Sequence, residues 1–322
     1  MKKPLVSSMV CVTISCPEPD KLEHLLLNYL DWEIFCSTDL NSNHEELWDI
    51  SKKSAGKNIK IYRSKKSDIG MIRVIKGKDR IKNSPMSTRW SGVEIIVTED
   101  LVGLCNSLKE SEIFKVIKPV DEADFTHAGA NIHTFFHGIG PGLTHWMFTM
   151  AVTQPETYAF PNSPNKVGHI FDVHLDVHKE DESRNFYQNI LKMDMHFDDM
   201  LREGLFYNAW DLDLSHSPVQ MTIYKGDSEW LMGGIEMRSF FQKTMDLTPP
   251  IPNEFDGGAC MTTFTVKNIN DVYEIIQKYP NARAITEPKI IKSLPYSGGK
   301  TFSALGPKGE RLEFVEKWEN NN

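Results

Sequence analysis

The chain has 322 residues, of which 40% are hydrophobic and 25% charged, and its formal net charge is −8. This length predicts about two folded domains, and the composition is that of an ordinary globular protein rather than a disordered one. The acidic balance argues against nucleic acid as a partner. No segment reaches the roughly 18 apolar residues that a membrane span needs.

Cysteine usage points to a reducing compartment. The five cysteines are odd in number and show no CxxC spacing, which argues against a disulfide framework or a structural zinc site. We therefore expect a cytoplasmic protein. The N-terminus could also be read as a short lipoprotein signal ending at Cys16, but Val10, Val12 and Ile14 alternate as in a half-buried strand.

In chain order, the sequence repeats one small unit four times. The first copy has a strand at 10–16, an amphipathic helix at 19–29, a return strand at 31–35 and a last strand near 71–75. The second begins with a strand at 92–97 and a helix at 100–108. A Gly-Pro turn at Gly140-Pro141 then leads into its last strand, which ends near Phe148.

The third and fourth copies follow the same pattern. The third has a strand at 170–177, a helix at 180–191, a strand at 194–197 and a last strand near 220–224. The fourth has a strand at 259–266 and a helix at 272–279, and its Gly306-Pro307 turn matches that of the second copy. The order predicts an α+β fold of four βαβββ modules, paired into two tandem domains.

We expect the domains to follow chain order. Modules at about 8–78 and 90–150 would form a first domain over 1–155, and modules at about 167–227 and 257–319 a second domain over 166–322. The connection at 152–166 is rich in proline and asparagine, as expected of exposed, extended chain. A cup completed within one chain permits a monomer, and a homodimer stays open.

Two segments carry a family resemblance. Residues 174–191, with Phe186-Tyr187 before Leu191, resemble the opening strand and helix of the vicinal oxygen chelate superfamily, and residues 306–314 resemble its terminal turn and strand. The superfamily includes glyoxalase I, extradiol dioxygenases, and fosfomycin-resistance and bleomycin-binding proteins. Its metal-dependent members bind the ion with a glutamate at the place of Glu313. The resemblance to four-module relatives implies that the second domain is the active half.

Strand alternation supplies the other candidate site residues. In the third module the first-strand ligand position falls on Asp172, with His174 on the same face. In the fourth it falls on Met261, flanked by Thr263. A thioether is a poor ligand for hard or borderline divalent ions, which argues against iron-dependent ring cleavage. We therefore expect Asp172, His174 and Glu313 to be catalytic, in a pocket whose walls are Met261, Thr263, Trp210 and Phe302.

The first half of the chain is predicted to be structural. Its matching positions fall on Cys11, Gly92 and Met147, which are not the usual ligands. His127, His133, His137 and His145 form a dense cluster, read here as exposed strand and loop histidines that do not share one face. A zinc or proton-transfer role for them is the alternative.

Three functions stay open for a small-molecule substrate or ligand. The preferred one is a metal-independent or atypical isomerase, cyclase or lyase that moves protons on a medium-sized, partly hydrophobic substrate. The second is a protein that binds and sequesters a small molecule without turnover. The third is a glyoxalase or extradiol-type dioxygenase that binds iron, manganese or zinc through a non-standard set, His174 and Glu313 with water. We expect a lid formed by the aromatic residues around 206–241.

Overall fold

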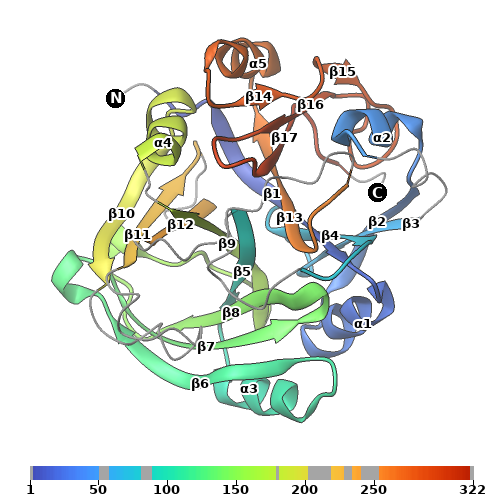
Figure 1. Cartoon of the computed structure of the whole chain (residues 1–322). Coiled ribbons are helices and arrows are strands. Elements are labelled where there is room, and N and C mark those ends of the chain that lie inside the picture. Colours follow the sequence, from blue (N-terminus) through green and yellow to red (C-terminus); the bar gives the residue numbers. More distant parts are fainter. Residues whose placement is uncertain are drawn as a thin grey trace.

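The computed structural model describes residues 3–50, 58–80, 89–178, 181–201, 219–227, 234–240 and 254–319. In these residues two curled sheets, one of nine strands and one of eight, lie side by side with helices on their outer faces (Figure 1). No helix within the described ranges is both long and apolar enough to cross a membrane. Trp210, predicted to line the pocket, and most of the expected lid lie outside the described residues.

The first two modules begin with the strands and helices that the sequence predicts. The first contains β1 Val6–Cys16, α1 Pro19–His24 with a π-helical continuation Leu25–Tyr29, β2 Glu33–Asp39, α2 Ser42–Trp48, β3 Asn58–Arg63 and β4 Met71–Lys76. The second contains β5 Arg89–Val97, α3 Leu101–Glu110, β6 Lys115–Asp124, a 3-10 turn Thr126–Ala128, β7 Ile132–Gly140, a 3-10 turn Pro141–Leu143 and β8 Thr144–Ala151.

A connection with one 3-10 turn, Glu156–Tyr158, leads to the other two modules. The third contains β9 Val167–His178, α4 Asp181–Arg184 with a π-helical continuation Asn185–Ile190, β10 Asp194–Leu201, β11 Val219–Lys225 and β12 Gly234–Phe240. It therefore extends past the predicted end at 227. The fourth contains β13 Gly258–Val266, α5 Ile269–Lys278, β14 Arg283–Ala284, β15 Lys289–Ile290, β16 Lys300–Leu305 and β17 Arg311–Val315.

The modules pair in a different order from the one expected. In the nine-stranded sheet β1 is antiparallel to β13, so the first module joins the fourth. In the eight-stranded sheet β5 is antiparallel to β9, so the second module joins the third. The expected pairing in chain order is therefore wrong, and the connection at 152–166 joins two modules of one sheet. Four first strands of similar apolar character allow either pairing, so local sequence does not distinguish them.

The hydrophobic core has three parts. The largest lies between the sheets and their helices, and smaller apolar clusters fill the concave face of each sheet. On β9, Val173, Leu175 and Val177 face the shared core. Because side chains alternate along a strand, Asp172 and His174 lie on the opposite, concave face. The same alternation that buries the strand therefore aims polar residues into the cup.

Gly70 lets the two sheets approach each other closely. Its φ is +61°, its N–H donates to the Met9 carbonyl, and its own carbonyl accepts from the Ile170 N–H. A Cβ there would lie 2.0 Å from the Ile170 carbonyl oxygen. We expect Gly70→Ala to lower the free energy of unfolding by more than the roughly 1–2 kcal/mol that left-handed backbone alone costs.

Urea unfolding at neutral pH measures this loss. Gly129→Ala is the matched control, since Gly129 has a φ of +75° but a Cβ there would meet no atom within 4 Å. Equal losses in the two variants would show that the contact between the sheets contributes nothing.

Candidate metal centre

Three buried side chains of metal-ligand type meet on the concave face of the eight-stranded sheet. Glu94 comes from β5, His174 from β9 and Glu236 from β12, and each is at most 4% exposed. One ligand atom of each lies within 4.8 Å of the others. Nε2 of His174 is 3.9 Å from Oε2 of Glu94. Strand register causes this convergence, because His174 is opposite Gly92 on one side and opposite Glu236 on the other.

Burial sets the protonation of these groups. Removal from water raises the pKa of both Glu94 and Glu236, and the charge of Glu236 raises that of Glu94 further. Burial also lowers the pKa of His174 well below its usual range, and the positive charge of Arg238 adds to this effect. The imidazole is therefore neutral at physiological pH and keeps a lone pair for a ligand. A divalent cation would favour the ionised form of both carboxyl groups.

Several polar atoms of the cluster have no hydrogen-bond partner within the described part of the chain. They are both ring nitrogens of His174, Oε1 of Glu236 and both carboxyl oxygens of Asp172. Such atoms cost free energy when buried. Imidazole nitrogen and carboxylate oxygen suit Fe²⁺, Mn²⁺ or Zn²⁺, and three protein ligands leave positions open for substrate oxygens. Glu94, His174 and Glu236 therefore fit a divalent ion.

Arg238 is held on the same face, next to the three ligand-type residues. Its Nε donates to Oδ1 of Asp176 at 2.7 Å, and its Nη2 donates to Oγ of Ser91 at 2.5 Å. The side chains of Arg238 and Asp176 are at most 1% exposed. The fixed positive charge counteracts the effect of burial on the pKa of Glu236. It thus supports an ionised carboxylate at one ligand position.

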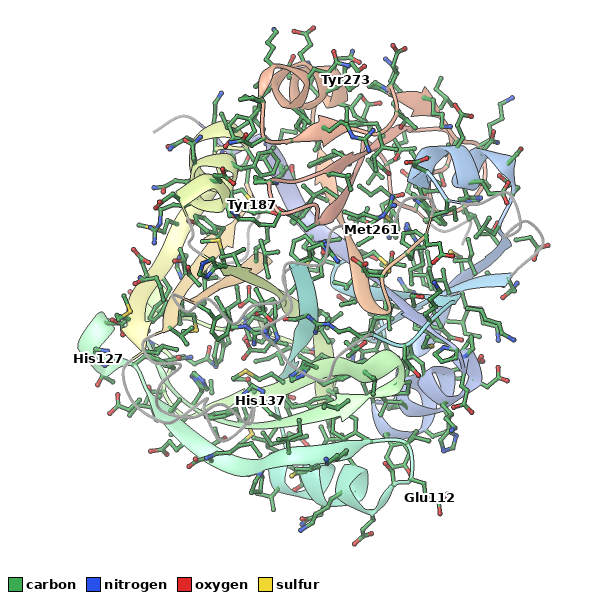
Figure 2. The ribbon with its side chains drawn as sticks, in the orientation of Figure 1. Glu112, His127, His137, Tyr187, Met261 and Tyr273 are labelled. Carbon is green, nitrogen blue, oxygen red and sulfur yellow. The ribbon has the colours of Figure 1, made fainter. Side chains whose placement is uncertain are left out.

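Three of the four clustered histidines line this cup. His133 and His137 on β7 and His145 on β8 are buried, and the latter two lie near enough to His174 to lower its pKa. The prediction that His133 and His137 do not share a face is wrong, because a spacing of four residues in a strand puts both on one side. Figure 2 shows His137 in the interior and His127 at the edge of the molecule. There, Nε2 of His127 lies 2.7 Å from Oδ2 of Asp199 on β10.

An apolar wall surrounds the polar centre. Its aromatic members come from strands β7, β9, β10 and β12, the β6–β7 connection and the β8–β9 connection: Phe125, Phe135, Tyr158, Phe160, Phe171, Phe197 and Phe240. Ring contacts such as Phe125 to Phe197, with centroids 5.5 Å apart, bring the two edges of the sheet together. The site therefore combines ionisable groups at its base with an aromatic rim, as ligand pockets commonly do.

The corresponding positions of the nine-stranded sheet carry different side chains and partners. The buried carboxylate at the position that corresponds to Glu236 is Glu313, on β17. Trp48 and Tyr296 each donate to Oε1 of Glu313 at 2.7 Å. Thr263 and Arg73 donate to Oε2 at 2.7 and 2.8 Å. Although burial raises the pKa of Glu313, the Arg73 guanidinium and these hydrogen bonds hold it below the usual range.

Register relates the two cups position by position. His174 opposite Glu236 corresponds to Thr263 opposite Glu313. By the same count Glu94 corresponds to Thr13 and Met147 to Arg73. The cup of the nine-stranded sheet, called the first cup, thus keeps one of the three ligand-type residues, Glu313. Its positive charge is the Arg73 guanidinium, which stacks 4.9 Å above the Trp48 ring. Its residues do not fit a metal ion.

The predicted site residues are consequently divided between the sheets. Asp172 and His174 lie in the second cup, while Glu313, Met261 and Thr263 lie in the first. The expected grouping of Asp172, His174 and Glu313 is wrong, because it rested on pairing the third module with the fourth. Phe302 faces the shared core and stacks on Phe314 with centroids 5.1 Å apart, so it lines neither cup.

Sequence reasoning missed Glu94 and Glu236. Glu94 is a lone carboxylate in the otherwise apolar run Val93–Val97, a pattern that itself signals a buried functional acid. It is two residues from Gly92, the position that was checked. Glu236 follows Gly234 on β12, a strand that the sequence did not reveal. Extending the third module by one strand would have placed it beside His174.

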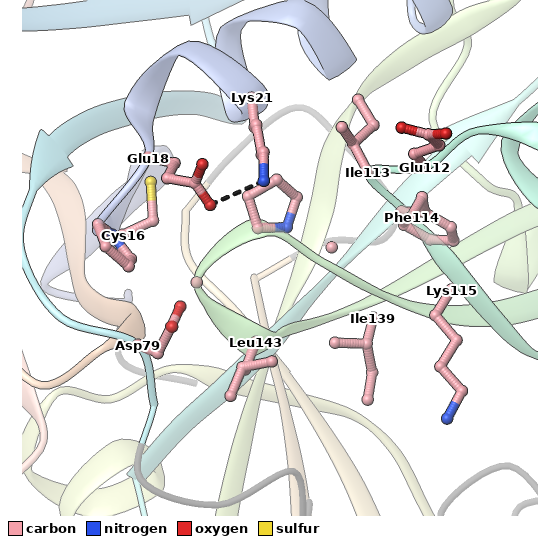
Figure 3. A pocket seen from close by; sticks show the side chains of 14 residues that line it. Cys16, Glu18, Lys21, Asp79, Glu112, Ile113, Phe114, Lys115, Ile139 and Leu143 are labelled. Carbon is pink, nitrogen blue, oxygen red and sulfur yellow. Dashed lines mark hydrogen bonds and ion pairs between the residues drawn. The ribbon is translucent and has the colours of Figure 1, made fainter.

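A surface cavity of about 350 Å³ lies elsewhere, between the end of β1, helix α1 and the β7–β8 turn. Figure 3 shows Glu18 and Lys21 at its edge, paired at 2.8 Å, with Cys16 beside them. Burial raises the pKa of Cys16 to about 12. The cysteine is therefore a thiol at neutral pH and lacks the thiolate that a nucleophile needs.

The chain has the vicinal oxygen chelate fold, as the sequence motifs predicted. Glyoxalase I from Zea mays is similar, with a TM-score of 0.60 at 11% identity over 96% of this chain and 92% of that one. A mutant of that enzyme gives a TM-score of 0.62 at 12% identity. A putative dioxygenase from Bacillus subtilis gives 0.57 at 9% identity, over 98% of this chain and 86% of that one. No protein-family model and no curated protein matches the sequence.

Proposed function

We propose that the chain is a divalent-metal-dependent enzyme with one active centre, formed by Glu94, His174 and Glu236. The observation that carries this proposal is the convergence of three buried ligand atoms within 4.8 Å. It replaces the metal-independent interpretation favoured by the sequence, which rested on Met261. That residue belongs to the other cup. Iron, manganese and zinc are the candidate ions. The proposed substrate is a small molecule, and the proposed location of the enzyme is the cytoplasm.

The bound ion would act as a Lewis acid that polarises two neighbouring oxygens of the substrate. The protein supplies the rest. Glu94, His174 and Glu236 would hold the ion at the base of the cup, and the aromatic rim would exclude water from the apolar part of the substrate. Burial raises the pKa of Asp172, which favours the protonated form of its carboxyl group. Proton transfer beside a chelated oxygen is the chemistry of an isomerase or lyase.

A ring-cleaving dioxygenase is the second candidate. The dense aromatic rim favours it, because a catechol ring would pack against such a wall while its two hydroxyl oxygens chelate the ion. Consumption of O₂ with catechols by the Fe²⁺ form would identify this activity. Exchange of a substrate proton with D₂O in the Mn²⁺ or Zn²⁺ form, without O₂ uptake, would identify the isomerase or lyase.

Metal stoichiometry tests the proposed centre. After chelator treatment and reloading with Mn²⁺, Fe²⁺ or Zn²⁺, we expect about one ion per chain in the wild type by elemental analysis. His174→Ala and Glu236→Gln should lose more affinity than the roughly 10–100-fold that removal of a partner behind a ligand costs.

The double variant Arg73→Met with Glu313→Gln is the control, because it changes the corresponding position in the other cup and removes both partners of its buried ion pair. It should keep the full metal content. Full occupancy in His174→Ala, or loss of metal in the folded double variant alone, would contradict the assignment. Tight binding of a small molecule that is unchanged in chelator-treated wild type and in His174→Ala would instead support a sequestering protein.

A further inference from the structure

Glu94 reaches the proposed metal centre from β5, a strand that lies between two others of the same cup. β5 is parallel to β8 on one side and antiparallel to β9 on the other (Figure 1). The carboxyl group of Glu94 is buried, and buried polar atoms need partners. Its two oxygens have different surroundings, and this difference decides which of them an ion can use.

Oε1 of Glu94 has a partner on β8. The hydroxyl of Thr149 donates to this oxygen, and Thr149 is fully buried. Side chains alternate along β8, where Trp146 and Phe148 face the shared core, so Thr149 faces the cup. Its partner in the strand register is Ile96, which follows Glu94 on the same face of β5. Strand geometry therefore places the hydroxyl beside the carboxyl group.

Oε2 of Glu94 lies on the side of β9. It is 3.9 Å from Nε2 of His174, which is too far for a hydrogen bond. Two ligand atoms that are each about 2.1 Å from one metal ion can be separated by this distance. One carboxyl oxygen thus accepts from a hydroxyl, and the other faces a second ligand-type residue.

The first cup lacks both the carboxylate and the donor. By strand register Glu94 corresponds to Thr13 in that cup, and Thr149 corresponds to Ile75. Isoleucine has no hydroxyl and cannot donate a hydrogen bond. The donor is therefore present in the cup that contains the carboxylate and absent in the cup that does not. This joint change is expected if the threonine serves the carboxylate.

We propose that Thr149 is a positioning residue of the metal centre, which holds Oε1 of Glu94 so that Glu94 binds the ion through Oε2 alone. This inference rests on the proposed metal centre. An oxygen that stays bonded to a hydroxyl does not enter the coordination sphere, so the position that it would take remains open for substrate. Removal of a residue that orients a metal ligand commonly lowers metal affinity about 10- to 100-fold.

Titration of the metal-free protein with Co²⁺ tests this role, because the visible bands of the bound ion depend on its coordination number and geometry. Thr149→Val keeps a β-branched side chain and removes the hydroxyl. We expect about 10- to 100-fold weaker Co²⁺ binding, with altered visible bands, since Oε1 of Glu94 is then free to bind the ion. Thr149→Ser restores a hydroxyl and should recover most of the affinity and the wild-type bands.

Thr263→Val is the matched control in the first cup. Thr263 is also fully buried, and its hydroxyl donates to a buried carboxylate, Oε2 of Glu313, at 2.7 Å. This variant should bind Co²⁺ as the wild type does. Urea unfolding of the metal-free proteins should show lower stability in both valine variants, so a difference in Co²⁺ binding between them does not come from stability.

Unchanged Co²⁺ affinity and bands in Thr149→Val would overturn the positioning role and leave the metal centre standing. Equal weakening in Thr149→Val and Thr149→Ser, or in Thr149→Val and Thr263→Val, would also overturn it, because the Thr149 hydroxyl would not be the cause. Absence of Co²⁺ binding by the wild type would overturn the metal centre and the positioning role together. If Thr149→Val does not fold, Thr149→Ala removes the same hydroxyl and is compared with Thr149→Ser in the same way.

Discussion

Replacing Arg73 with methionine should lower the free energy of unfolding by about 3–5 kcal/mol, the usual cost of removing one partner of a buried ion pair. The guanidinium and the Glu313 carboxylate are at most 1% exposed and 2.8 Å apart. Methionine fills much of the same volume but leaves the carboxylate charged, buried and without a cation. Urea unfolding at pH 7, followed by tryptophan fluorescence, measures the loss.

Two further variants separate the ion pair from general effects of the substitution. Arg63→Met removes a guanidinium paired with Glu33 and Asp68, whose side chains are 40% and 89% exposed, and should cost no more than about 1 kcal/mol. Arg73→Met combined with Glu313→Gln removes both charges and should recover most of the lost stability. If the double variant is as unstable as Arg73→Met alone, packing rather than charge explains the effect.

The Arg73 pair also shows where sequence reasoning stops. Glu313 was predicted to be functional because residues 306–314 resemble a terminal strand whose glutamate binds metal. Whether Glu313 is free to bind a metal ion depends on Arg73, which lies 240 positions away in the sequence and forms an ion pair with it. The two residues meet only because β1 and β4 lie in the same sheet as β13 and β17. Local patterns predict the strands, the helices and their order. They do not specify which of four similar modules share a sheet.

His174 shows what local patterns do predict. Alternation on β9 placed His174 and Asp172 on a concave face, and both lie there, buried at the base of a cup. Its partners were missed for two physical reasons. Glu94 comes from a module that was judged structural by its neighbour Gly92, and Glu236 from a short strand without a strong apolar pattern. One of the three ligand-type residues of this cup was thus predictable, while the complete set required the fold.

If the proposed centre binds a metal ion, its removal should lower the free energy of unfolding, and we expect this loss to grow as the pH rises. A ligand that binds only the folded state at about 1,000 times its Kd stabilises that state by about 4 kcal/mol, so chelator treatment should lower the melting temperature by several degrees. Without the ion, Glu94 and Glu236 stay close together and buried, and the pKa of each lies above the ordinary value of 4.5. Metal-free protein therefore carries an unfavourable pair of carboxyl groups.

The sign of the pH effect follows from proton binding. Above pH 4.5 the folded metal-free protein holds more protons on these two groups than the unfolded chain does, so stability falls as pH rises toward their raised pKa values. Buried histidines act in the opposite direction. Burial lowers the pKa of His133 to about 4, so folding is favoured more as pH rises toward the ordinary value of 6.5. The contribution of the carboxyl pair is the difference in stability between wild type and a carboxyl variant at the same pH, because both proteins contain the same histidines.

Glu94→Gln supplies that comparison. Without metal it should be more stable than wild type at pH 8, and the difference should shrink toward zero near pH 4, where the wild-type carboxyl groups are protonated in both states. With Mn²⁺ or Zn²⁺ present the order reverses, because the variant has lost a ligand and gains little from the ion. Thermal unfolding of both proteins at pH 4 to 8, with chelator and with metal, gives all four curves. The contradicting result is a metal-free Glu94→Gln variant that is less stable than wild type by the same amount at every pH. In that case packing and hydrogen bonding alone would stabilise Glu94, and its carboxylate would carry no charge that a metal ion has to balance.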